Sequence, residues 1–309
     1  MNIISTYSSL NKHLSVDNAD VDHVSLSADD VYSVIRQPMV FLTRADITVS
    51  IFRSNWKFSD KMFEQHDVFF PKMKLGNSIG DNHQPSIIDG RSPGGYTFYH
   101  FMMETIPSAL FFKNDSIPIL CKPSDWAIPH FRWFGIQNTI LFGTPSMSCN
   151  LIHPTYMDIG NPSHEMIRLI RGVVESKLVF NPSIGILIKR REHRHIINHD
   201  ETLDMLKRKY STIEWYVFDS CSVEETALLF SRARIVAAPH GAGICNTVFC
   251  PSGTIVLEFV VKIDPNPCFW HLSEMLENKH YMIPTVTDDG TNFIVNIDEV
   301  YPVLPDINT

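Results

Sequence analysis

Apolar blocks alternate with amphipathic blocks along the C-terminal half of the chain, and this alternation predicts strands separated by helices. The apolar blocks are short and rich in Ile and Val, whereas the blocks between them repeat apolar residues at helical spacing. Such an alternation favours an α/β fold with a parallel, doubly wound sheet. We expect strands at residues 184–188, 212–218, 234–238 and 254–260, and helices at 199–210, 223–233 and near 243–249.

Two of these helices begin with capping signals. Asn198 stands at the start of the first, and Asp200 and Glu201 follow in its first turn, where the helix dipole favours acidic side chains. Ser222 and Glu225 have the spacing of a capping box at the start of the second. We therefore expect these two helices to begin at about residues 199 and 223.

The N-terminal half has a less regular pattern. Pro107 interrupts the helix expected after the loop at 81–95, so we expect a kink or a stop there. The change of pattern near residue 180 predicts an N-terminal domain of residues 1–180 and a C-terminal domain of residues 181–309. In the first domain we expect strands within 38–52, 116–122 and 138–143, a polar Pro/Gly-rich loop at 81–95, and a helix at 163–180 capped by Ser163.

Composition narrows the class of protein. The 309 residues are 44% hydrophobic and 19% charged, which is typical of globular domains, and the net charge of −8 argues against nucleic acid as a partner. No stretch has the roughly 18 apolar residues of a membrane span. The six cysteines form no C-x-x-C pair, which favours reduced thiols over a zinc site or a disulfide framework. We expect a soluble, cytoplasmic protein.

Three polar features follow the predicted strands at their carboxyl ends. Lys189, Arg190 and Arg191 follow the first strand, the tetrapeptide HGAG (240–243) follows the third, and Glu258 ends the fourth. In open α/β sheets, ligands bind at the carboxyl edge. The sequence therefore predicts that these features meet in one binding site.

The residue types suit a nucleotide diphosphate. Arg190 and Arg194 carry guanidinium groups that fork onto phosphate oxygens. His240 leads into Gly241, Ala242 and Gly243, where glycines let the backbone approach a ligand and a helix N-terminus attracts anions. A carboxylate such as Glu258 accepts hydrogen bonds from two ribose hydroxyls, although it could equally be a structural partner of a helix N-terminus. Arg191, His193 and His195 fit surface positions better than ligand contacts.

His100 and Glu104 stand four residues apart in the otherwise aromatic and apolar stretch YTFYHFMMETIP (96–107), so they share one helix face. Two interpretations stay open. The pair is either a catalytic element or a buried hydrogen-bonded pair that only fixes structure.

A serine hydrolase is a competing interpretation. HGAG is similar to the oxyanion loop of esterases, and GNSIG (76–80) matches G-x-S-x-G. In esterases, however, the oxyanion loop precedes the nucleophile, and the DNHQPS that follows here is a poor start for a helix. The order of the motifs therefore argues against a hydrolase.

Four blocks together resemble glycosyltransferase family 61. HGAGICNTVFCPSGTIVLEF (240–259) is similar to its C-terminal signature, and ILIKRREHRHIIN (186–198) is similar to its R-x-x-x-R-x-h-h-N block, where h is hydrophobic, through Arg190, Arg194 and Asn198. YHFMMETIP (99–107) is similar to its first block, in which many members carry Asp where this chain has Glu104. WHLSEMLENKHYMI (270–283) is similar to the segment that closes the domain. The resemblance covers about residues 90–285.

The resemblance implies a GT-B fold, in which two Rossmann-like domains face a central cleft. It implies an inverting glycosyltransferase that needs no metal cofactor and moves xylose, arabinose or N-acetylglucosamine from a UDP-sugar to a glycan or protein hydroxyl. The sequence offers no D-x-D motif beside a predicted strand. Many members have a transmembrane anchor; none is found in this sequence, so we expect a bacterial or viral cytosolic enzyme.

In this reading, residues 181–309 bind the nucleotide sugar, with a last segment that could pack back on the N-terminal domain, and residues 1–180 present the acceptor. Glu104 is the expected general base, with His100 orienting it or contacting the donor; His100 as the base is the remaining option. The expected donor-site residues are Arg190, Arg194, Asn198, His240, Gly241, Ala242, Gly243, Asn246 and Glu258.

Overall fold

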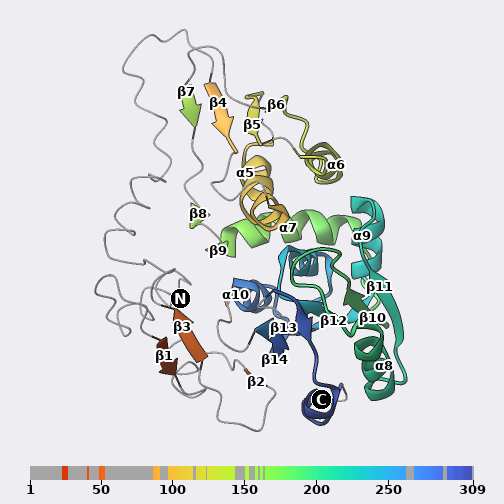
Figure 1. Cartoon of the computed structure of the whole chain (residues 1–309). Helices are drawn as coiled ribbons and strands as arrows, with labels where there is room; N and C mark the ends of the chain where they lie inside the picture. Colours follow the sequence, from red (N-terminus) through yellow and green to blue (C-terminus); the bar gives the residue numbers. More distant parts are fainter. Residues whose placement is uncertain are drawn as a thin grey trace. The chain divides into compact units, whose positions relative to one another are not determined.

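The computed structural model of the chain describes residues 23–26, 40–41, 49–52, 86–90, 97–113, 116–122, 124–142, 150–152, 157–158, 161–162, 164–261, 268–287 and 291–307. Contacts divide the chain into two compact units. Unit 1 comprises Met1–Ser59, Val179–Cys221 and Thr226–Thr309, and unit 2 comprises Asp60–Leu178 and Ser222–Glu225. The elements of both units are labelled in Figure 1.

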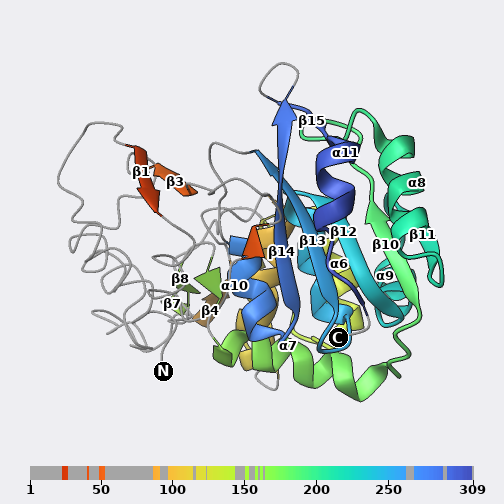
Figure 2. The ribbon, with the colours of Figure 1, turned by 90° about the horizontal axis from the view of Figure 1, so that it is seen from below.

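Unit 1 contains a parallel sheet in the order β11-β10-β12-β13-β14. The first strand along the chain, β10, lies between the second and the third, so the order reverses between β10 and β12. This reversal is a topological switch point, where doubly wound sheets bind ligands. The strands can be followed in Figure 2. They are β10 (Ile184–Ile188), β11 (Glu214–Phe218), β12 (Ala233–Pro239), β13 (Ile255–Val261) and β14 (Lys279–Thr287).

These strands confirm the predicted α/β class and parallel sheet. The sequence pattern did not predict β14, which carries a histidine of the site described below. Two short strands extend the sheet at β14: β15 (Phe293–Ile294) pairs antiparallel and β2 (Val40–Phe41) pairs parallel. A separate antiparallel pair joins β1 (His23–Leu26) to β3 (Val49–Phe52), so the strands expected within 38–52 are also confirmed.

The helical elements of the same chain segments follow the strands as expected. The predicted capping box is confirmed, because the Ser222 backbone N–H donates to Glu225 Oε2 at 3.1 Å and the Glu225 N–H donates to Ser222 Oγ at 3.3 Å. The helix expected near 243–249 is a 3-10 helix. The elements are α8 (His199–Lys209), α9 (Val223–Phe230), the 3-10 helix η2 (Ala242–Phe249), α10 (Cys268–Met275), α11 (Ile297–Val300) and the 3-10 turn η3 (Tyr301–Val303).

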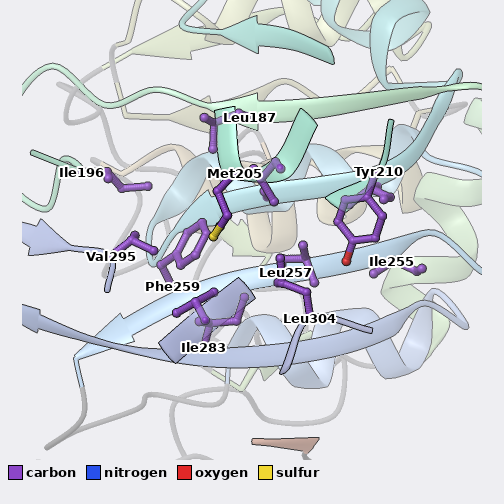
Figure 3. Packing of buried hydrophobic residues seen from close by; sticks show 14 of the residues in the cluster. Leu187, Ile196, Met205, Tyr210, Ile255, Leu257, Phe259, Ile283, Val295 and Leu304 are labelled. Atoms are coloured by element: carbon purple, nitrogen blue, oxygen red, sulfur yellow. The ribbon is translucent and has the colours of Figure 1, made fainter. Parts of the chain in front are cut away.

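One face of the unit 1 sheet carries an apolar cluster (Figure 3). Leu257 and Phe259 of β13 pack there with Met205 of α8 and Leu304 near the C-terminus. Because side chains alternate across a strand, Glu258 between them faces the opposite side of the sheet. The alternation thus separates the apolar core on one face from a buried carboxylate on the other.

The neighbouring strand β11 leaves no room for a side chain at Gly185 of β10. A Cβ atom at this position would lie 2.6 Å from the indole ring of Trp215, which is its register partner on the adjacent strand. That distance is too short for any side chain, so a larger residue would push the ring off the sheet. Trp215 in turn packs against the apolar cluster.

Unit 2 contains a four-stranded parallel sheet in the order β6-β5-β4-β7. The order reverses between β4 and β7, which makes a second switch point. The strands expected at 116–122 and 138–143 are confirmed, but the expected loop 81–95 is wrong in part, because it contains the central strand β4. The strands are β4 (Ser86–Asp89), β5 (Ile119–Cys121), β6 (Ile140–Phe142) and β7 (Asn150–Ile152), and a small antiparallel pair joins β8 (Met157–Asp158) to β9 (Asn161–Pro162).

The helix predicted to kink or stop at Pro107 runs past it. A wide π-helical turn, η1 (Phe101–Thr105), joins α4 (Phe98–His100) to α5 (Ile106–Phe111). In this turn the Ile106 N–H donates to the Phe101 carbonyl, five residues back. Because Pro107 has no N–H, the wide turn lets the helix continue without the bond that proline cannot make.

Two further helices complete the described part of unit 2, α6 (Ala127–Trp133) and α7 (His164–Lys177). The predicted helix at 163–180 is confirmed by α7, which packs against α5 (Figure 1). The expected cap Ser163 lies outside the described residues. In the part of the chain that the structure describes, no helix has the length and apolarity that crossing a bilayer requires.

Candidate functional site

The switch point of unit 1 brings two of the predicted site residues into contact. Arg190 follows β10 and His240 follows β12, and these strands pair directly. The Arg190 Nη1 atom donates a hydrogen bond to the His240 carbonyl at 3.3 Å. Parallel strands end at the same edge of a sheet, so the topology alone explains why residues 50 positions apart meet here.

Gly241 allows the guanidinium group of Arg190 to lie against the loop backbone. A Cβ atom at Gly241 would lie 1.7 Å from Arg190 Nη1, which is far inside van der Waals contact. Gly243 has a similar role toward the core, because its Cβ would lie 3.1 Å from Ile188 Cγ2. Ala242 begins the 3-10 helix that follows. The glycines of HGAG thus let Arg190 and Ile188 approach the loop.

A second arginine lies within electrostatic reach of the first. Burial lowers the pKa of Arg190, and the positive charge of Arg194 lowers it further. Arg194 has a left-handed backbone, with φ of 64°, in the turn after β10. The two positive charges repel each other, and a bound anion would relieve that repulsion.

Glu258 lies at the centre of a buried hydrogen-bond network. Its Oε1 atom lies 2.5 Å from His240 Nδ1, and its Oε2 atom lies 2.8 Å from His280 Nε2. His280 Nδ1 lies in turn 2.7 Å from Ser273 Oγ. Burial by itself raises the pKa of Glu258, but the charge and hydrogen bond of His240 and the bond from His280 outweigh it and lower the pKa to about 2.

This network changes the interpretation of Glu258. The side chain is fully buried, and both carboxylate oxygens bind histidine rings, rather than lying open to a ribose or facing the backbone of a helix N-terminus. The ribose contact stays a prediction. His280 lies in the unpredicted strand β14 and Ser273 lies in α10, and neither is among the predicted site residues. The signal that could have found them was a second block of polar residues next to apolar ones at 270–283.

The two asparagines of the predicted site differ in their surroundings. Asn198 stands at the N-cap of α8 as expected, but its side chain makes no capping bond. Instead its Nδ2 donates to the Val295 carbonyl at 2.8 Å, and its Oδ1 accepts from the Val295 N–H at 3.0 Å. Asn246 is buried within the 3-10 helix. Asn198 therefore joins the turn after β10 to the C-terminal segment.

His100 and Glu104 form the predicted pair in unit 2. His100 Nδ1 lies 2.7 Å from Glu104 Oε1, with side-chain exposures of 21% and 0%. The π-helical turn carries Glu104, and Thr105 Oγ1 donates to the Gly90 carbonyl at 2.8 Å, which ties this turn to the end of β4. The pair thus follows the strand beside the switch point of its own sheet, as Arg190 does in unit 1.

The sequence also led to predictions about Arg191, the GNSIG segment and metal binding. Arg191 is exposed and forms an ion pair with Asp219 at 2.7 Å, which agrees with a surface position. The GNSIG segment lies outside the described residues. Among the residues that the structure describes, no group of three or more His, Cys, Asp or Glu side chains is arranged to hold a metal ion.

A comparison with known protein families identifies the family of this chain. A family model, Glycosyltransferase 61, matches residues 98–257, which is just over half of the sequence. The match begins two residues before His100 and ends one residue before Glu258, so it includes both switch-point segments. A search of curated proteins returned no match. The family match agrees with the resemblance found in the sequence, and the chain belongs to glycosyltransferase family 61, as an enzyme that transfers a sugar from a donor to a glycan acceptor.

Proposed function

We propose that this glycosyltransferase is an inverting enzyme of GT-B type that moves a sugar from a UDP-sugar to a glycan hydroxyl without a metal cofactor. The donor would bind at the carboxyl edge of the unit 1 sheet. The observation that carries this proposal is the contact of Arg190 with the His240–Gly241 loop across the switch point. Xylose and N-acetylglucosamine are the first donor sugars to test.

The diphosphate is the part of the donor that this site suits best. Arg190 and Arg194 lie within electrostatic reach of each other, and the loop that begins at Gly241 brings backbone close to Arg190. As the bond to the sugar breaks, negative charge grows on the departing diphosphate, and fixed positive charges stabilise it. The arginines would supply the stabilisation that a metal ion supplies in other enzymes, so we expect activity to withstand chelation.

The proton of the acceptor hydroxyl needs a base as the oxygen attacks the anomeric carbon. Glu104 is fully buried and bound to His100, whereas His100 is partly exposed. We propose that the two act as one unit, in which His100 Nε2 takes the proton and Glu104 stabilises the resulting cation. The new bond joins the acceptor oxygen to the anomeric carbon, and the diphosphate leaves with the electron pair of the broken bond.

Thermal stabilisation by nucleotide sugars tests the donor site. A ligand that binds only the folded state raises the melting temperature by mass action. We would compare UDP-, GDP-, CMP- and ADP-sugars, each with and without EDTA, for wild type, Arg190→Ala and Arg191→Ala. Arg191 is the matched control, because it is the neighbouring arginine and is paired with Asp219 at the surface.

The proposal expects a shift with a UDP-sugar that EDTA does not change, that Arg190→Ala abolishes and that Arg191→Ala retains. A shift only with another nucleotide would replace UDP as the donor. Binding without turnover on any acceptor would support a nucleotide-sugar-binding protein that has lost transfer, and release of free sugar without an acceptor would support a hydrolase.

A further inference from the structure

Each hydrogen bond around Glu258 can be given a donor and an acceptor. An ionised carboxylate only accepts hydrogen bonds, so His240 must donate from Nδ1 and His280 must donate from Nε2. His280 Nδ1 is then free to accept the hydroxyl proton of Ser273. In this arrangement His280 is neutral, and each polar atom of the chain from Ser273 to His240 has a partner.

The negative charge of Glu258 needs hydrogen-bond donors, because a buried carboxylate without them is costly. Both histidines supply one, but their exposures differ: the His280 side chain is 1% exposed and that of His240 is 16% exposed. A ligand can therefore reach His240, whose Nε2 is the ring nitrogen that does not face Glu258.

Several titratable groups lie near His240 and Glu258. Arg190 contacts its carbonyl from the end of β10, Arg194 and Glu192 act on Arg190 from the following turn, and Cys268 at the start of α10 lies within electrostatic reach of Glu258. The Phe269 ring contacts the His240 imidazole edge to face at 5.0 Å. Arg190 therefore holds the backbone of His240, and Glu258 holds its ring.

We propose that Ser273, His280 and Glu258 are positioning residues that keep His240 protonated at Nδ1 and oriented with Nε2 toward the donor diphosphate. This inference rests on the proposed function for the identity of the ligand. It assigns roles to two residues outside the HGAG loop. His280 holds Glu258 in place, and Ser273 fixes the tautomer of His280 by donating to its Nδ1, so that Glu258 can orient the histidine that meets substrate.

The first test needs no ligand. Nitrogen-15 spectra of histidine-labelled full-length protein distinguish the two neutral tautomers from the cation, and His240→Gln and His280→Gln assign the two signals. We expect His280 to carry its proton on Nε2, because its Nδ1 accepts from Ser273. We expect His240 to carry a proton on Nδ1, which faces Glu258.

The second test uses UDP as the probe with variants of the network. In His280→Leu, Glu258 loses one of its two hydrogen-bond donors and no longer holds the His240 ring in place, so we expect UDP affinity to fall about tenfold. His280→Gln should restore the affinity, because its amide can donate to Glu258 Oε2.

Melting temperatures show that each variant is folded before its affinity is compared. A His240 with its proton only on Nε2, a His280 with its proton only on Nδ1, or an unchanged UDP affinity in His280→Leu would overturn the inference. Failure of UDP to bind at any pH would instead overturn the proposed donor, while the spectra of the free protein would still decide the state of His240.

Discussion

Glu104 is completely buried, and its Oε1 atom lies 2.7 Å from Nδ1 of the partly exposed His100. In unit 1 the fully buried Glu258 relates to the partly exposed His240 in the same way, at 2.5 Å. Each unit therefore holds a carboxylate whose contact with any substrate would pass through a histidine. Neither glutamate offers an exposed oxygen in this structure, which favours His100 over Glu104 as the group that meets the acceptor.

Removal of either member of the unit 2 pair should reduce turnover more than binding. We expect His100→Gln and Glu104→Gln each to lower kcat by about 10²- to 10⁴-fold, the range of general base catalysis, with little change in KM for the donor. Because the two residues act as one unit, the double variant should lose little more than either single variant. Steady-state kinetics with the identified donor measure these effects.

The matched control for this pair is Glu175→Gln. Glu175 also pairs with a residue four positions away, at 2.9 Å from Arg171, but it is 56% exposed on α7. The control should retain wild-type kcat. If His100→Gln and Glu104→Gln retain kcat and only lower the melting temperature, the pair has a structural role and the proposed base is wrong.

Gly241→Ala should weaken donor binding without unfolding the protein. The added Cβ would meet the far end of a flexible side chain, Arg190 Nη1, so the guanidinium can move away at low cost in stability. Its displacement removes a positive charge from the site, and loss of such a charge-assisted contact is worth about 1.5–3 kcal/mol. Calorimetric titration with UDP should show a fall in affinity of about one to two orders of magnitude.

Gly172→Ala is the control for this substitution, because nothing lies within 4 Å of a Cβ at Gly172, inside α7. It should leave UDP affinity unchanged and stabilise the protein by up to about 1 kcal/mol through helix propensity. Equal affinity of Gly241→Ala and wild type would show that the position of Arg190 does not matter for binding.

Asn198→Ala should affect stability rather than donor affinity. The side chain satisfies both the N–H and the carbonyl of Val295, and leaving these groups without partners costs about 1–3 kcal/mol. Urea unfolding measures the free energy of unfolding, with the exposed Asn181→Ala as control. A large loss of UDP affinity in folded Asn198→Ala would instead support the donor contact that the sequence suggested.

Acid should destabilise the protein through His271. Burial lowers the pKa of this histidine from 6.5 to about 3, so the folded state binds fewer protons than the unfolded state between these values. The stabilisation is complete above pH 6.5 and is lost as the pH falls toward 3. One proton taken up on unfolding gives a slope of about 1.4 kcal/mol per pH unit.

Unfolding free energies of wild type and His271→Leu between about pH 4.5 and about pH 6.5 isolate this contribution, because the carboxylates with lowered pKa titrate mainly below that window. Burial also lowers the pKa of His130, so the variant should keep part of the slope. Parallel pH profiles for the two proteins would rule out His271 as the source.

The strands and helices of residues 184–261 could be predicted from the sequence because each has a strong local signal. Val236 and its neighbours form an uninterrupted apolar run, and Ser222 and Glu225 form a capping box whose bonds span only three residues. The strand β4 was missed because its neighbours along the chain are polar and rich in Pro and Gly. It is a strand because β5 and β7 satisfy its backbone on both sides, which local sequence does not encode.

The sequence by itself determined which residue types follow the strands, and hence that Arg190 and His240 belong to one edge of one sheet, whereas Glu258 proved to lie within β13. Only the tertiary structure decided what each side chain touches. Register and topology place Glu258 between His240 and His280, 18 and 22 positions away, and place Asn198 on Val295, 97 positions away. Contacts between residues so far apart depend on strand order and packing, whereas caps and periodicity depend on neighbours within a few residues.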